Sequence, residues 1–107
     1  MVNPAERRKH ERFALPCRVS VELPAGGDVR GRTVNVSDGG ACFITETPPA
    51  VGGQVCVRLT VPRDTANTFF LEQFAAKAFV VRCEPAAEGS AQCVALRFEK
   101  ELALDLR

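Results

Sequence analysis

The sequence lacks several residues on which common binding functions depend. It has no tryptophan, no tyrosine and one histidine in 107 residues, so phenylalanine is its only aromatic residue. Barrels that bind single-stranded nucleic acid stack the bases on aromatic rings along a basic groove. Most of the seven phenylalanines stand among apolar neighbours. We therefore expect these rings in the core and no nucleic-acid partner, with single-strand binding kept as an alternative.

No stretch of the chain predicts a membrane segment or an export signal. The apolar runs fall short of the about 18 residues that a membrane-spanning helix requires. The basic N-terminal residues are not followed by the apolar region of a signal peptide. We therefore expect no membrane span and a cytoplasmic location.

Metal-binding and catalytic patterns are also missing. The five cysteines include no Cys-x-x-Cys pair, and the only histidine, His10, lies close to the N-terminus, so no metal site is expected. The chain has no Gly-x-Ser-x-Gly, Walker A or His-Glu-x-x-His pattern. We therefore expect no enzymatic activity and no cofactor, and we interpret the cysteines as reduced, small apolar side chains.

The composition is that of one globular domain with an uneven charge distribution. Hydrophobic residues make up 46% of the chain and charged residues 25%, which are ordinary values for a single domain of this length. Residues 1–12 contain four basic and two acidic residues, whereas the remainder is close to neutral. We interpret residues 1–12 as a flexible basic N-terminal arm and residues 13–107 as the folded domain. This distribution favours a small anionic ligand over a nucleic-acid coat, which needs a domain-wide basic face.

Alternating apolar and polar residues predict about six short strands. The alternation is cleanest over residues 55–61, where every second residue is Val or Leu. The predicted strands cover residues 17–23, 29–37, 41–45, 55–61, 72–83 and 92–98. Residues 62–67 are expected to form a loop, and residues 99–107 a short C-terminal helix. The pattern indicates an all-β fold, either a small antiparallel barrel or a sandwich.

Three arginines in the arm suggest an anion-binding group. Arg8 and Arg12 are separated by three residues, and Arg7 adds a third guanidinium. A guanidinium can bind two phosphate oxygens at once, or the O6 and N7 atoms of guanine. The same residues could instead belong to a solvated tail.

A second group of polar residues lies in the hairpin predicted over residues 29–45. Asn35 and Ser37 are two residues apart on a strand, so their side chains should project from one face. Gly40, three residues further on, permits a positive φ or the close approach of another backbone. These residues could form part of a binding site or could merely shape the turn.

These two groups, RxxxR in the arm and NxSxxG in the hairpin, resemble the two signatures of the PilZ domain family, RxxxR and (D/N)xSxxG. The resemblance covers nearly the whole chain, and residues 94–98 also look like the closing strand of the family. It implies a PilZ-like six-stranded antiparallel β-barrel, with the arm crossing its outer face. It also implies that the ligand is cyclic di-GMP, a bacterial second messenger.

The resemblance assigns ligand-binding roles to six residues: Arg7, Arg8, Arg12, Asn35, Ser37 and Gly40. The arginines would bind phosphates and guanine edges, the two polar side chains would hydrogen-bond a guanine, and the glycine would let the backbone approach. Ligand would then order the arm against the barrel and create a surface for an unidentified protein target. The alternative is a PilZ-like protein-interaction module that does not bind nucleotide.

Overall fold

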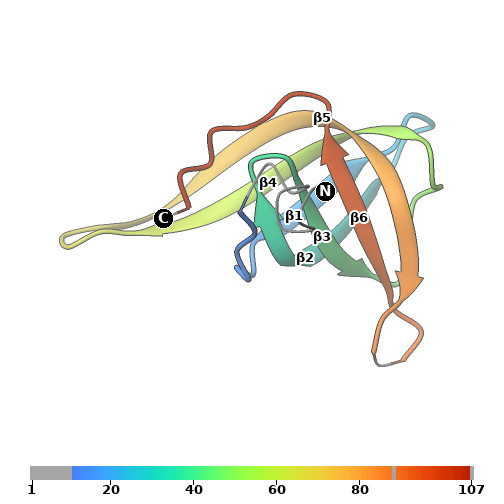
Figure 1. Cartoon of the computed structure of the whole chain (residues 1–107), viewed down its shortest axis with the longest axis horizontal. Helices are drawn as coiled ribbons and strands as arrows, with labels where there is room; N and C mark the ends of the chain where they lie inside the picture. The colour runs from blue at the N-terminus through green and yellow to red at the C-terminus, as the bar shows by residue number, and fades with distance from the viewer. Residues whose placement is uncertain (1–10, 88, 107) are drawn as a thin grey trace, which may run out of the picture.

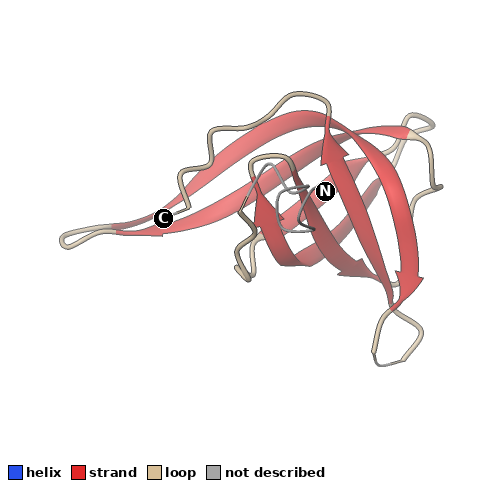
Figure 2. Ribbon diagram, viewed as in Figure 1, coloured by secondary structure: helices blue, strands red, loops and turns tan. Residues whose placement is uncertain are grey.

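The computed structural model describes residues 11–87 and 89–106, which form six β-strands. The strands are β1 (Arg18–Glu22), β2 (Asp28–Ser37), β3 (Gly40–Thr45), β4 (Gln54–Asp64), β5 (Phe69–Pro85) and β6 (Gln92–Phe98). All strand pairs are antiparallel. The strands close in the order β1-β2-β3-β6-β5-β4 into a barrel (Figures 1 and 2). The expected six-stranded antiparallel barrel is therefore confirmed.

The barrel closes because β1 pairs along both of its edges. Its five residues pair with residues 28–32 of β2 on one side and with residues 56–60 of β4 on the other. On the opposite side of the barrel, β6 pairs with both β3 and β5. Closure leaves these segments without a free edge on which another strand could pair.

The core is built from alternate residues of every strand. In β4 the buried positions from Val55 to Val61 alternate with more exposed ones, as the period-two pattern predicts. The largest fully buried side chains are Phe43, Leu59, Leu104, Val21, Val36, Val57, Val61, Val80 and Val94. Full burial of one such side chain contributes about 1.5–3 kcal/mol to the free energy of unfolding. The five cysteines form no disulfide bond. The apolar interior is therefore the main source of stability of the folded domain.

β4 and β5 extend beyond the barrel as a two-stranded ribbon, which projects to one side in Figure 1. β1 pairs with β4 only as far as Thr60, and β6 pairs with β5 only from Ala78 onwards. The expected loop over residues 62–67 is therefore wrong for residues 62–64, because β4 continues to Asp64, whereas residues 65–67 do lie in the turn between β4 and β5. Pro62 is tolerated in the strand because this part of β4 has a partner strand on one side only.

Two phenylalanines that were expected in the core lie near the tip of the ribbon instead. Phe69 is 64% exposed and Phe70 is 46% exposed, whereas Phe43 and Phe98 are buried. Apolar neighbours in the sequence indicate a strand, but they do not indicate which part of that strand the barrel covers.

The residues after β6 form an extended tail, so the expected C-terminal helix is wrong for residues 99–106. Leu104 is fully buried in the core, and Leu102 and Leu106 pack against it as partly buried side chains. These leucines alternate with exposed residues, which is the period of an extended chain and not of a helix.

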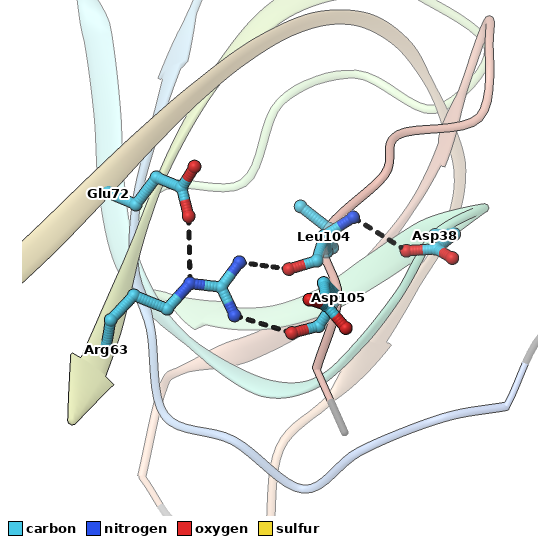
Figure 3. Close-up of polar contacts among 5 residues, drawn as sticks. All are labelled: Asp38, Arg63, Glu72, Leu104 and Asp105. Carbon is cyan, nitrogen blue, oxygen red and sulfur yellow. Dashed lines mark hydrogen bonds and ion pairs between the residues drawn. The ribbon is translucent and has the colours of Figure 1, made fainter. Parts of the chain in front are cut away.

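Polar side chains from β4 and from the turn between β2 and β3 satisfy the backbone of this tail, as Figure 3 shows. The side chain of Asp38 accepts a hydrogen bond from the Leu104 backbone nitrogen at 3.0 Å. The Arg63 guanidinium donates to the carbonyl oxygens of Leu104 and Asp105 and forms a 2.9 Å ion pair with Glu72. The tail therefore obtains its hydrogen bonds from the barrel rather than from helical turns.

Within the described residues, no helix is long and apolar enough to span a membrane.

Candidate functional site

Arg12 is positioned by the short segment that leads into β1. The backbone of Phe13 exchanges two hydrogen bonds with Val36 of β2, at 2.8 and 2.9 Å. Thr33 of β2 holds the same segment, since its hydroxyl accepts from the Cys17 nitrogen at 2.7 Å and donates to the Leu15 carbonyl at 2.6 Å. The chain therefore runs beside β2 before β1 begins, and Arg12 comes to lie over that strand.

A β-bulge in β2 determines which residues of this strand face outward. The register shifts between Thr33 and Asn35 and leaves Val34 as the extra residue. Thr33 is buried and pairs with Phe43, whereas Asn35 pairs with Cys42. Residues two apart on a regular strand face the same side, but the bulge places Thr33 and Asn35 on opposite surfaces of the barrel. Asn35 and Ser37 share the outer surface.

Ser37 and Gly40 form the tight turn between β2 and β3. The Ser37 hydroxyl accepts from the Gly39 nitrogen at 3.2 Å and lies 3.4 Å from the Gly40 carbonyl oxygen, to which it donates. A Cβ atom at Gly40 would overlap the carbonyl oxygen of Leu96 in β6. The sequence left two reasons for a glycine at position 40, a positive φ or the close approach of another backbone. The structure shows the second, and the approaching backbone is that of β6.

Arg12, the last residue of the arm motif, meets the hairpin motif on the outer surface of the barrel. The Arg12 guanidinium donates to Asn35 Oδ1 at 3.2 Å and lies 3.8 Å from the Cys42 sulfur. Arg12, Ser37 and Gly40 line an open pocket of about 600 Å³, a volume within the range of small-molecule sites. Arg7 and Arg8, the other two predicted ligand residues, lie outside the described residues.

Two further arginines line this pocket that sequence analysis did not select, Arg82 of β5 and Arg97 of β6. Arg97 pairs with Gly40 on one side and with Phe79 on the other, and its guanidinium lies 5.3 Å from the centre of the Phe79 ring. Arg82 forms an exposed 3.2 Å ion pair with Glu84. The alternation of the last strand indicates that Arg97 points outward, but only the strand order brings it beside the hairpin motif.

Acidic residues of the C-terminal tail complete the rim of the pocket. Glu99 and Glu101 line it together with Phe98. Asp38, between the two polar residues of the hairpin motif and its glycine, holds the tail through both its backbone and its side chain. The turn that carries the motif is thereby connected to the C-terminus, a role that sequence analysis did not give to Asp38.

Two cysteines that do not line the pocket, Cys17 and Cys93, have raised pKa values. Burial raises the pKa of Cys93 above the ordinary value, and the nearby Cys42 raises it further. Burial likewise raises the pKa of Cys17, although the hydrogen bond with Thr33 acts in the opposite direction. Among the described residues, no group of three or more His, Cys, Asp or Glu side chains could hold a metal ion. The polar side chains that line the pocket are the guanidinium groups of three arginines, the Ser37 hydroxyl, the Cys42 thiol and the carboxylates of Glu99 and Glu101.

Comparison with known families gives one match over nearly the whole chain. A family model described as the PilZ domain matches residues 6–107, which include both motifs. No curated protein sequence matches the chain.

Solved structures share the barrel fold. MotI (DgrA), the inhibitor of motility of Bacillus subtilis, has a TM-score of 0.75 at 17% identity, and the match covers 91% of this chain and 44% of that chain. The PilZ domain of YcgR from Escherichia coli, solved with c-di-GMP, has a TM-score of 0.58 at 19% identity, covering 87% and 78%. The PilZ domain of CeSA from a cellulose-synthesizing bacterium has a TM-score of 0.51 at 21% identity, covering 84% and 83%. This chain thus spans less than half the length of MotI.

Proposed function

The chain belongs to the PilZ domain family, and from this membership we propose that it is a cyclic di-GMP receptor that acts as an adaptor. One structure with the same fold, the PilZ domain of YcgR, was solved with c-di-GMP. The observation that carries the proposal for this chain is the contact of Arg12, the last residue of the arm motif, with the hairpin motif. Arg12 of the arm lies 3.2 Å from Asn35 of the hairpin, at the edge of a pocket that Ser37 also lines.

The chemistry of these side chains suits the ligand. Cyclic di-GMP carries two phosphodiester charges and two guanine edges. Arg8 and Arg12 would bind phosphates and guanine edges through the paired donors of the guanidinium. Asn35 and Ser37 would hydrogen-bond a guanine from the barrel surface. Arg7 would stack on or clamp a second copy of the ligand.

The output would come from the arm. Each charge-assisted hydrogen bond contributes about 1.5–3 kcal/mol, whereas ordering one residue costs about 1–2 kcal/mol. Arg12 is already held through Phe13, so the cost would fall on the residues that precede it. The hydrogen bonds must exceed this ordering cost, and we expect a net affinity near micromolar, about −8 kcal/mol. The arm laid across the barrel would then present a new surface to a protein target.

Calorimetric titration with cyclic di-GMP, with GTP as the reference ligand, tests the assignment. We expect selective binding by the parent chain and a loss of about tenfold to a hundredfold in affinity for Arg8→Ala and for Arg12→Ala. The matched control is Arg58→Ala, which removes an exposed arginine of β4 that does not line the pocket. Unchanged affinity in Arg12→Ala, with the chain still folded, would show that the site is elsewhere.

The second candidate is a PilZ-like interaction module that does not bind nucleotide. It is favoured by the present bonding of the site, because Arg12 is engaged by Asn35 and the Ser37 hydroxyl is engaged by its own turn. A folded parent chain that gives no heat above the GTP reference would select this candidate.

A further inference from the structure

The outer surface of β2, β1 and β4 carries four exposed arginines, Arg18, Arg30, Arg32 and Arg58, which we call the basic face. Arg30 and Arg58 lie on either side of Ser20 of β1, and Arg32 lies directly opposite Arg18 in the next row. All four are exposed, and each has a buried neighbour in the sequence, so they point away from the core. The near-neutral composition of the body therefore hides a concentrated positive charge.

Glu22 and Asp28 border the basic face in the row beyond Ser20, but no described acidic side chain forms an ion pair with its four arginines. The ion pairs between described residues include Arg63–Glu72 and Arg82–Glu84, and none of them involves the four arginines. Like charges directly opposite each other destabilise a sheet, and Arg18 and Arg32 are such a pair. Their strands lie about 5 Å apart, less than the Debye length of about 8 Å at physiological salt, so their potentials add. The arrangement favours an external anion over this surface.

The same outer surface continues along the ribbon to an apolar tip, which consists of Pro62, Phe69 and Leu71. Pro62 pairs with Leu71 and stands two residues beyond Thr60, the partner of Arg18. Phe69 is 64% exposed and Leu71 is 54% exposed, and the ribbon carries them away from the barrel (Figure 1). Behind the exposed turn of residues 65–68, which ends the ribbon, this surface is therefore apolar apart from Asp64, and the part nearer the barrel is cationic.

We propose that the basic face and the apolar tip dock the chain onto an anionic phospholipid bilayer. Headgroup phosphates would pair with the arginines, while the tip would enter the boundary of the acyl region, which lies within about 5–10 Å of the headgroups. Charge complementarity selects an anionic surface, and the exposed tip selects one with an apolar layer beneath. A nucleic acid offers phosphates without that layer, and β1, β2 and β4 contain no aromatic residue on which a base could stack.

This surface is separate from the candidate nucleotide site. None of the four arginines of the basic face lines the pocket that contains Arg12 and Ser37. Docking on a bilayer therefore goes beyond the proposed receptor function and does not depend on it. Titration of the basic-face variants with cyclic di-GMP keeps the two proposals distinguishable.

Co-sedimentation of the full chain with vesicles tests the proposal. We expect binding to vesicles of phosphatidylcholine with added phosphatidylglycerol, little binding to phosphatidylcholine alone, and release by added salt. Arg32→Gln should weaken binding about fivefold, the effect of one basic residue at an anionic surface. Lys100→Gln, which removes the same charge from an exposed position on the tail, should have a much smaller effect.

Variants of the tip separate apolar insertion from simple charge attraction. The double variant Phe69→Ser/Leu71→Ser should lose binding at constant charge, while Asp64→Asn, which removes the acidic group opposite Phe69, should strengthen it. Absence of binding to the anionic vesicles at low salt would overturn the proposal. Equal losses in Arg32→Gln and Lys100→Gln would also overturn it, because net charge alone would then be responsible. Binding of duplex DNA in place of the vesicles would assign the basic face to nucleic acid instead.

Discussion

Gly40 shows how a neighbouring strand can dictate a single residue. Its φ is not positive, so the turn itself does not require glycine at this position. The carbonyl oxygen of Leu96 occupies the place that a Cβ atom would take, and this oxygen belongs to the backbone of β6, which cannot move aside as a flexible side chain could. The close pairing of β3 with β6 therefore depends on the missing side chain.

We expect Gly40→Ala to lower the free energy of unfolding by about 1–3 kcal/mol, the usual effect of forcing an extra carbon into a filled space. Urea denaturation measures this loss. The matched control is Gly53→Ala, where the nearest atom to an added Cβ, the Ala50 carbonyl oxygen, lies 3.4 Å away. Equal losses in the two variants would contradict the explanation, because the contact with Leu96 would then have no special effect.

Single residues of the candidate site differ in how far the sequence could predict them. Spacing alone indicates that Asn35 and Ser37 share a surface, and the register places them so. The contact of Arg12 with Asn35 could not be derived from spacing, because it depends on the bridge between Phe13 and Val36. Arg97 could not be selected either, since β3 and β6 are neighbours in space but not in the sequence.

The C-terminal tail is the element that behaves least as its sequence first suggests. It has no secondary structure of its own, yet Leu104 is fully buried in the core. Arg63 and Asp38 hold its backbone on two sides. The tail is therefore part of the folded domain and closes one region of the barrel.

We expect Leu104→Ala to lower the free energy of unfolding by about 2–5 kcal/mol, the range for a buried leucine that leaves a cavity. Leu71→Ala is the matched control, because Leu71 is 54% exposed, and a surface change of this kind alters stability by about 0.5 kcal/mol or less. Thermal or urea denaturation of the two variants measures the difference. A small loss in Leu104→Ala would mean that the tail is not needed for the core.

Strands were easier to predict than their limits. The period-two pattern over residues 55–61 lies within β4, but the ends of β4 and β5 depend on a ribbon that pairs outside the barrel. The bulges at Val34 and Val81 could not be predicted from the alternation of apolar and polar residues. The position of each extra residue depends on the pairing with the neighbouring strand. The helix expected for the tail is wrong, although Leu102, Leu104 and Leu106 stand at every second position of the sequence, as in an extended chain.

At the scale of the whole molecule, strand number and turn spacing predict the fold class but leave barrel and sandwich open. The decision depends on whether β1 pairs with β4, a contact between segments that are distant in the sequence. The resemblance of two short motifs to the PilZ signatures predicts the barrel, which the pairing of β1 with β4 confirms. The distribution of surface charge could not be predicted from composition either. The body is near neutral overall, and only the register of β2, β1 and β4 brings the four arginines of the basic face together.

The proposed division of the chain into an arm, residues 1–12, and a barrel leads to a last prediction. All strands of the barrel lie between Arg18 and Phe98, and the bridge from Phe13 to Val36 is the first pairing along the described chain. Removal of residues 1–10 should therefore leave cooperative unfolding in urea with a midpoint close to that of the full chain. The same truncation should abolish binding of cyclic di-GMP in calorimetry, because Arg7 and Arg8 are lost. The full-length variant Arg7→Ala/Arg8→Ala is the control and should bind as poorly as the truncated chain. Retained binding in the truncated chain would remove the arm from the receptor mechanism, and loss of cooperative unfolding would move the domain boundary towards the N-terminus.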